Sequence, residues 1–185
     1  HPKTRYNIRL AEKKDVKEKI IKGADLKNHF ETFYRLLKET SIRGKFGLHL
    51  KKYYEILFEK AIHDENINLF LTEYEGKVLT AHLIIYFGET AFYPFGGSSV
   101  EHQNLMPSYL SHWRAMQEAK KHGCKYYNFG AVDIGAKVTH DNWQGITSFK
   151  QKFGGELLEY SDFHDIVAQP FWYRLYNLRK RFKKH

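Results

Sequence analysis

A lysine set between two phenylalanines is the residue in this sequence with the clearest capacity for chemistry. The segment reads Ser148-Phe149-Lys150-Gln151-Lys152-Phe153, and a helix there places Phe149 and Phe153 on one face with Lys150 beside them. A lysine near a cleft can hold a phosphate or stabilise a developing oxyanion. The competing interpretation is an ordinary surface lysine on an amphipathic turn.

A glycine- and serine-rich stretch lies upstream, at the end of a predicted strand. It reads Tyr93-Pro94-Phe95-Gly96-Gly97-Ser98-Ser99. Glycines allow a close backbone approach or a positive φ, and the N–H groups of a turn before a helix can bind a phosphate or a carbonyl oxygen. A plain strand-to-helix loop with a serine cap is the alternative.

The predicted elements that position these residues alternate between helices and strands. Spacing of apolar residues predicts helices over residues 4–14, 25–43, 50–61, 106–122 and 146–153, and a basic helix that begins at Pro170. Period-two or continuous apolar runs predict strands over residues 16–21, 67–74, 78–87, 90–95 and 125–129, with late strands at 157–160 and 164–167.

The connections between these elements indicate the fold. Short turns make residues 67–95 an antiparallel meander, whereas the helix after it makes the next strand parallel to the last one. This order resembles the Gcn5-related (GNAT-like) acyltransferase fold. The resemblance implies an α/β (α+β) domain with flanking helices and a mixed, mostly antiparallel sheet, whose central strands splay apart to admit substrate.

Coenzyme A is not expected as the acyl donor. An acetyl-CoA enzyme of this fold needs a Gln/Arg-x-x-Gly-x-Gly/Ala loop before its crossover helix, and the corresponding residues 100–107 contain no glycine. The sequence therefore predicts no cofactor. The eleven histidines show no metal-ligand spacing, and we expect His112 and His122 on a helix surface. Asp133, His140 and Asp141 are loop candidates for substrate contact.

A spaced series of motifs resembles the Fem family of non-ribosomal peptidyl aminoacyltransferases, which form the interpeptide bridges of peptidoglycan. The series covers nearly the whole chain. It comprises residues 93–99, Met106-Pro107-Ser108-Tyr109-Leu110 with Trp113, Tyr127-Asn128-Phe129-Gly130, Gly145-Ile146 with Phe149-Lys150, Phe153-Gly154-Gly155, and an opening at residues 3–11 that is similar to the start of the family's second GNAT-like domain.

The resemblance implies a substrate pair and a set of site residues. The donor would be aminoacyl-tRNA, and the acceptor a UDP- or lipid-linked muramyl-pentapeptide precursor whose side-chain amine attacks the aminoacyl ester. Lys150 and Phe149 would be catalytic, and Lys150 and Lys152 would bind RNA. The precursor side would be lined by Tyr93, Ser98, Ser99, Tyr109 and Tyr127. No metal is implied.

The sequence departs from the family pattern at two points. Asn128 stands where family strands often carry aspartate, so a carboxylate role there is lost. The family pairs two such domains, whereas this sequence resembles the second alone. We therefore expect residues 1–170 to form one GNAT-like domain, residues 171–185 a basic C-terminal helix or tail, and another domain upstream of His1.

Charge and cysteine content suggest where the protein acts. Six of the nine net positive charges fall in residues 172–185, which contain no acid. Such a tail is either a solvated helix end or a contact for RNA or an anionic membrane surface. A single cysteine, Cys124, fits a reducing compartment, so we expect the cytoplasm, with a peripheral contact at the inner face of the membrane. Two alternatives stay open: an acyltransferase with another activated donor such as acyl-CoA, and a non-catalytic RNA- or membrane-binding module.

Overall fold

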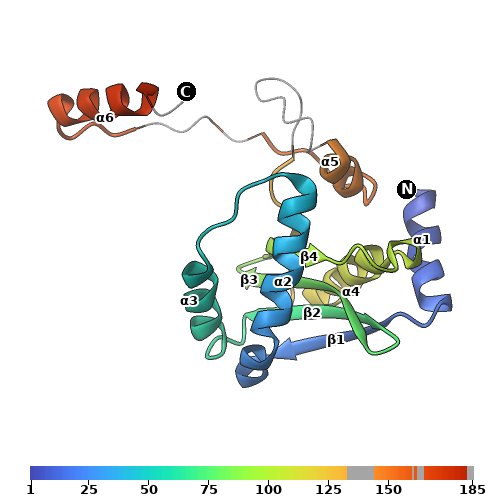
Figure 1. Cartoon of the computed structure of the whole chain (residues 1–185). Helices are drawn as coiled ribbons and strands as arrows, with labels where there is room; N and C mark the ends of the chain where they lie inside the picture. The colour runs from blue at the N-terminus through green and yellow to red at the C-terminus, as the bar shows by residue number, and fades with distance from the viewer. Residues whose placement is uncertain (133–143, 160, 162–164, 183–185) are drawn as a thin grey trace. The chain divides into compact units, whose positions relative to one another are not determined.

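The computed structural model describes residues 1–132, 144–159, 161 and 165–182 (Figure 1). The chain divides into two compact units, residues 1–154 and residues 155–185. Among the described residues, the first unit contains the sheet and five α-helices, and the second contains one helix, α6 (Pro170–Phe182). The upstream domain expected from the sequence stays a prediction.

A five-stranded sheet in the order β1-β2-β3-β4-β5 forms the centre of the first unit. Its first three pairings are antiparallel, and β5 pairs parallel to β4. The sheet is therefore mixed and mostly antiparallel, as expected. The strands are β1 (Lys17–Lys22), β2 (Ile67–Tyr74), β3 (Lys77–Phe87), β4 (Thr90–Ser98) and β5 (Tyr126–Asn128).

One face of the sheet is covered by α2 (Leu26–Gly44) and α3 (Lys51–Ala61). Apolar residues recur along α2 at helical spacing, so that Phe33, Leu36 and Leu37 all face the sheet and are buried. Tyr54 and Phe58 of α3 complete this part of the core. Figure 1 shows α2 lying across β3 and β4.

The opposite face is covered by α4 (Pro107–Lys121), against which α1 (Pro2–Lys13) packs. Small residues at a spacing of four, Ser111, Ala115 and Ala119, allow α4 to lie close to the sheet. The two alanines meet Phe70 and Ile84 from β2 and β3. A short 3-10 helix, η2 (Gln103–Leu105), leads into α4, and α5 (Gln144–Gln151) follows β5.

The sheet opens where β4 and β5 part. Their pairing is limited to three residues of each strand, from Thr90↔Tyr126 to Phe92↔Asn128. Beyond Phe92, β4 continues to Ser98 with its other edge still paired to β3. The splayed strands predicted from the sequence are therefore present, and the C-terminal half of β4 forms one wall of the opening.

Gly96 and Gly97 lie inside β4 and not in the predicted turn, because they continue the pairing with His82 and Ala81 of β3. Gly97 shows why glycine is needed there. A Cβ atom at this position would lie 2.2 Å from the backbone carbon of Leu36 in α2. Helix and strand are thus in direct backbone contact, which is the close approach that the sequence suggested.

Two other predictions differ from the structure. Residues 157–159 and 165–167, the described parts of the predicted late strands, form no strand. The side chain of Asp25 makes no N-cap hydrogen bond, since the chain turns through a short 3-10 helix (Gly23–Asp25) before α2 begins. The other helices and strands appear within a few residues of their predicted bounds.

Substituting Gly97 with alanine tests the contact between α2 and β4. The added Cβ must push apart two backbones, so we expect Gly97→Ala to lower the free energy of unfolding by about 3 kcal/mol. Gly47→Ala is the matched control, because nothing lies within 4 Å of a Cβ there. Urea unfolding followed by circular dichroism measures both; equal stabilities would contradict the contact.

Candidate functional site

A pocket of about 780 Å³ lies at the opening between β4 and β5. Its walls come from the last turns of α2, the connection from α2 to α3, residues 93–98 of β4, the start of α4, residues 129–131 after β5, and α5. All of these belong to the first unit. The pocket therefore lies where the acyltransferase resemblance placed the substrate.

Lys150 of α5 lines the pocket together with Phe149. Its Nζ donates a hydrogen bond to the carbonyl oxygen of Ala131 at 2.7 Å, and burial lowers its pKa to about 8. A lysine ammonium has three donors, so a bound group can still be contacted by the others. The side chain combines a positive charge with partial loss of water, which strengthens its action on a developing negative charge.

Aromatic rings hold α5 in place beside the pocket. Phe149 packs edge-to-face on Tyr109 of α4 at a centroid distance of 4.9 Å, and Phe153 stacks on the same tyrosine at 5.5 Å. Phe129 lies 5.1 Å from Phe153. This apolar packing sets the direction of Lys150, so the aromatic residues around the lysine position it.

The other predicted site residues fall into two groups. Tyr93 and Ser98 line the pocket. Ser99, Tyr109 and Tyr127 do not, although Tyr109 packs on Phe149 and Tyr127 contacts His112, which both line it. Ser99 Oγ accepts a hydrogen bond from the backbone N–H of Glu101 (3.0 Å), and Tyr127 Oη is 3.0 Å from Nδ1 of His112.

Lys152 and Asn128 each accept one hydrogen bond, Lys152 through its backbone and Asn128 through its side chain. The carbonyl oxygen of Lys152 accepts a hydrogen bond from Thr4 Oγ1 at 2.5 Å, which ties α1 to the end of α5. Lys152 does not line the pocket. Oδ1 of Asn128 accepts from the N–H of Gly130 at 2.7 Å, and a carboxylate could accept the same bond. The asparagine that stands in place of the family's usual aspartate can therefore form the same turn.

Sequence reasoning missed several residues of the pocket, among them one arginine and two histidines. Arg43 of α2 donates from Nη2 to Ser98 Oγ at 2.8 Å and lies at the rim. His82 of β3 and His112 of α4 line the floor and are buried. The expected surface position of His112 was wrong, because one turn of α4 faces the sheet there and buries the ring. The expected surface position of His122 is confirmed, and its ring stacks on Tyr86.

The charges around the pocket are of one sign. Arg43, Lys45 and Lys150 line it, and no aspartate or glutamate does so among the residues that the structure describes. Asp133, His140 and Asp141, the predicted loop candidates, lie outside the described residues. The described walls favour an anionic ligand group or an electron-rich carbonyl over a cation.

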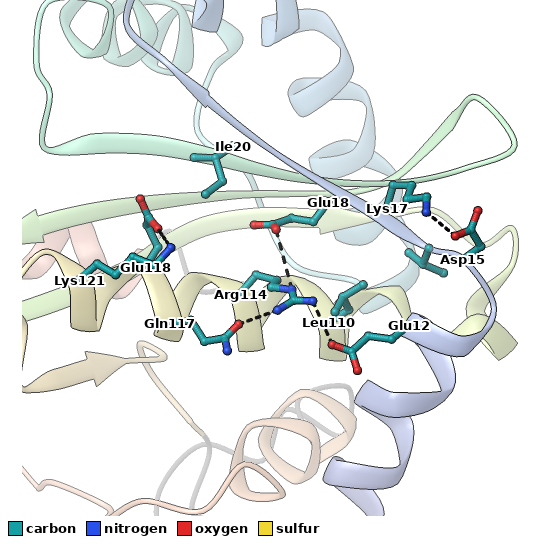
Figure 2. Close-up of a pocket in the computed structure, with 11 residues that line it drawn as sticks. Glu12, Asp15, Lys17, Glu18, Ile20, Leu110, Arg114, Gln117, Glu118 and Lys121 are labelled. Atoms are coloured by element: carbon teal, nitrogen blue, oxygen red, sulfur yellow. Dashed lines mark hydrogen bonds and ion pairs between the residues drawn. The ribbon is translucent and has the colours of Figure 1, made fainter.

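A second pocket, of about 440 Å³, lies between α1, β1 and α4 (Figure 2). Its charged groups are paired with one another. Arg114 contacts Glu12 (3.0 Å) and Gln117 (2.9 Å) and approaches Glu18 (3.9 Å). Burial raises the pKa of Glu18. None of the predicted site residues lies here, and the ion pairs fasten α1 and β1 to α4.

Replacing Lys150 with methionine tests its burial. The ordinary lysine pKa is 10.5, so between about pH 8 and pH 10.5 the unfolded chain binds a proton that the folded chain does not. The free energy of unfolding of the wild type should therefore rise with pH across this window, relative to that of Lys150→Met. Urea unfolding at several pH values measures the difference; parallel curves would show that the lysine is hydrated.

Comparison with known proteins places this geometry in a family. The sequence profile of the FemAB family matches residues 61–181. The lipid II:glycine glycyltransferase of Staphylococcus saprophyticus is 30% identical over 122 residues, which are 65% of this chain and 29% of that relative. The chain thus spans less than a third of the length of this relative.

Solved structures agree on the fold. The crystal structure of FemX superposes with a TM-score of 0.67 at 18% identity, covering 80% of this chain and 52% of FemX. An aminoglycoside acetyltransferase from an uncultured soil metagenomic sample superposes with a TM-score of 0.58 at 14% identity, over 82% of this chain and 96% of the enzyme. The fold is therefore GNAT-like, and the match of the family profile to most of the chain shows that the protein belongs to the FemAB family.

Proposed function

We propose that this chain carries the transfer site of a Fem-type aminoacyltransferase, which moves an amino acid from aminoacyl-tRNA to the side-chain amine of a peptidoglycan stem peptide. The observation that carries the proposal is Lys150, partly buried at the splayed strands in a pocket whose described charged residues are cations. The relative named above is a lipid II:glycine glycyltransferase, which supports glycine as the transferred residue and lipid II as the acceptor.

The proposed reaction is the aminolysis of an activated ester. The neutral amine of the acceptor attacks the carbonyl carbon, a C–N bond forms, and the bond to the ribose oxygen breaks. One proton leaves the nitrogen and one is gained by the ribose oxygen. An aminoacyl ester needs positioning and an oxyanion partner more than a protein nucleophile. Lys150 supplies the positive charge, and Phe149 keeps the lysine beside the carbonyl.

Binding of the RNA end is assigned to the cations of this region. Lys150, Arg43 and Lys45 line the pocket, and Lys152 follows on the turn after α5. Phosphate contacts of this type contribute affinity that falls with salt. Tyr93 and Ser98 in the pocket, with Ser99, Tyr109 and Tyr127 around it, are assigned to the precursor side.

The segment before α4 argues against coenzyme A as the donor. Residues 103–105 form a 3-10 helix, and α4 begins at Pro107, which has no N–H to offer to a pyrophosphate. Met106 before it adopts a left-handed conformation. A donor whose leaving group is held by cationic side chains suits this chain better than one held by backbone N–H groups.

Replacement of the two lysines separates transfer from RNA binding. In the natural full-length protein, Lys150→Ala should lower kcat for transfer by roughly 100-fold or more, as expected for the loss of an oxyanion partner. Lys152→Ala should raise KM for the aminoacyl-RNA several-fold and leave kcat unchanged. Lys120→Ala removes an exposed lysine from the far end of α4 and is the matched control.

Transfer from charged minihelix RNA to lipid II measures these effects. Near-normal turnover by Lys150→Ala would contradict the proposal. Thermal stabilisation by coenzyme A, but not by aminoacyl-RNA, would favour the acyl-CoA alternative. RNA binding that is indifferent to the aminoacyl group would favour a non-catalytic module.

The second unit supports a peripheral contact with the membrane. Along α6, Phe171, Leu175 and Leu178 lie on one helical face and are 72%, 53% and 54% exposed. Arg174 and Arg179 are also exposed. An apolar face flanked by basic residues is typical of a helix that lies in the interface of an anionic membrane. None of the helices in the described part of the chain combines the length and apolar character needed to cross a bilayer.

Polar substitution on α6 tests this contact at the inner face of the membrane. Phe171→Ser with Leu175→Ser should lower binding to vesicles that contain phosphatidylglycerol by roughly 10-fold or more. Phe87→Ser is the matched control, because Phe87 is 79% exposed at the end of β3. Vesicle co-sedimentation of the full-length protein is the measurement. Equal binding by both variants would show that α6 does not make the membrane contact.

A further inference from the structure

Helix α1 carries exposed cations that no acid in the described structure neutralises. There are four of them, Lys3, Arg5, Arg9 and Lys13. None forms an ion pair or a side-chain hydrogen bond with another described residue. The one acid of α1 is Glu12, and its carboxylate contacts Arg114 of α4 at 3.0 Å. The outer surface of α1 therefore carries a positive charge without a counter-ion.

Three of these cations form a row along the helix. The residues that α1 buries are Thr4, Asn7, Ile8 and Ala11. Arg5, Arg9 and Lys13 follow one another at a spacing of four and lie on the opposite face. Four residues of an α-helix rise by about 6 Å, so each cation can reach a different group of an extended anionic ligand. We call these three residues the α1 row.

Stability of the helix does not account for the α1 row. Like charges at a spacing of four destabilise a helix. Other helices of the first unit pair cations with acids instead, as Arg35 does with Glu39 on α2 at 2.6 Å, and Lys51 of α3 does with Glu31 of α2 at 2.6 Å. An external anion would supply the counter-charge that α1 lacks.

The α1 row begins beside the segment that carries the catalytic lysine. Thr4 is buried, and its Oγ1 donates a hydrogen bond to the carbonyl oxygen of Lys152 at 2.5 Å. Lys152 follows Lys150 by two residues, on the turn after α5. Figure 1 shows the start of α1 on the side of α5, and from there α1 leads toward β1. The α1 row therefore extends away from the proposed site of transfer.

The composition of α1 favours a nucleic acid over a membrane. Tyr6 is the one large apolar residue exposed on α1, whereas a helix that lies in a bilayer interface needs a whole apolar face. Arginine and lysine side chains are the usual contacts for the phosphates of a nucleic acid strand. Phosphate contacts need no apolar surface, so the α1 row suits an RNA backbone.

We propose that the α1 row binds phosphates of the base-paired stem of the donor RNA. This inference rests on the proposed aminoacyl transfer, which assigns the 3′ end of that RNA to the pocket at Lys150. The stem behind the 3′ end must then cross the surface beside α5, where α1 begins. Double-stranded RNA is recognised mainly through its shape and its backbone. The α1 row therefore adds affinity for any stem and carries no preference for its sequence.

Removing the three charges together tests the assignment. In the full-length protein, the triple variant Arg5→Gln, Arg9→Gln, Lys13→Gln should bind an RNA minihelix roughly 10-fold or more weakly at low salt. The slope of log affinity against log salt concentration should become shallower by about 2 to 3, because each phosphate contact contributes about 0.9. Fluorescence anisotropy of a labelled minihelix measures both quantities. Glutamine keeps a good helix propensity, and circular dichroism checks that the helix remains.

A second triple variant controls for the change in total charge. Lys27→Gln, Lys60→Gln and Lys120→Gln remove the same charge from exposed positions on α2, α3 and α4. This control should bind the minihelix within about 3-fold of wild type and keep the wild-type salt slope.

A short single-stranded RNA with the same 3′ nucleotides separates the α1 row from the pocket. It can occupy the pocket but has no stem to reach α1. The α1-row variant should therefore bind this RNA as tightly as wild type does. In transfer assays with charged minihelix and lipid II, the same variant should be slow at low RNA concentration, and saturating RNA should restore its rate.

Three outcomes would overturn the inference: an unchanged salt slope, an equal loss in the control variant, or an equal loss for the single strand. Weaker binding to phosphatidylglycerol vesicles with unchanged RNA binding would also overturn it and assign the α1 row to a membrane. If wild-type protein transferred nothing to lipid II, the proposed function itself would fail. Wild-type transfer and salt dependence in the α1-row variant would exclude α1 alone and leave the function standing.

Discussion

The short pairing between β4 and β5 is the constraint on which the rest of the structure depends. Three residue pairs hold the strands together before they diverge. A longer pairing would close the sheet and leave no room for the pocket. A shorter one would free β5, and with it the turn at Gly130 and the carbonyl of Ala131 that binds Lys150. Shape and charge of the site both follow from where this pairing stops.

Local pattern was enough to predict most of the fold. Periodicity located the helices and the meander, because side chains at regular spacing must face the sheet or the solvent. The lysine between aromatics was identified for the same reason, since Phe149 and Phe153 share a helical face. The failures came from contacts made across the fold. Gly96 and Gly97 read as a turn, yet pairing with β3 and the approach of α2 keep them in a strand.

The two histidines of the pocket, His82 and His112, also owe their positions to contacts that the local sequence pattern does not reveal. Sequence reasoning does not single out His82, which lies between apolar neighbours in a buried strand. His112 looked like a surface residue on an amphipathic helix. Their significance arises only when β3 and α4 pack face to face. One feature of the sequence could have indicated His82. A histidine in the middle of a mostly apolar strand is costly to bury without a partner, so its presence there suggests a role.

The cationic and the aromatic side chains of the pocket have different roles. Arg43, Lys45 and Lys150 provide positive potential, whereas the rings of Phe129, Phe149 and Phe153 exclude water and fix geometry. Electrostatic interactions are stronger where water is excluded. A site built this way can act on a reactive ester without a nucleophile of its own, which fits the proposed chemistry.

The backbone contact at Gly97 makes the two walls of the pocket mechanically unequal. On one side, α2 and β4 touch without an intervening side chain and are further joined by Arg43 and Ser98. That wall has little freedom to adjust. On the other side, α5 is held mainly by packed rings, which can shift by small rotations. Differences in the size of a group held in this pocket should therefore be accommodated by substitutions on α5, while the α2–β4 wall stays fixed.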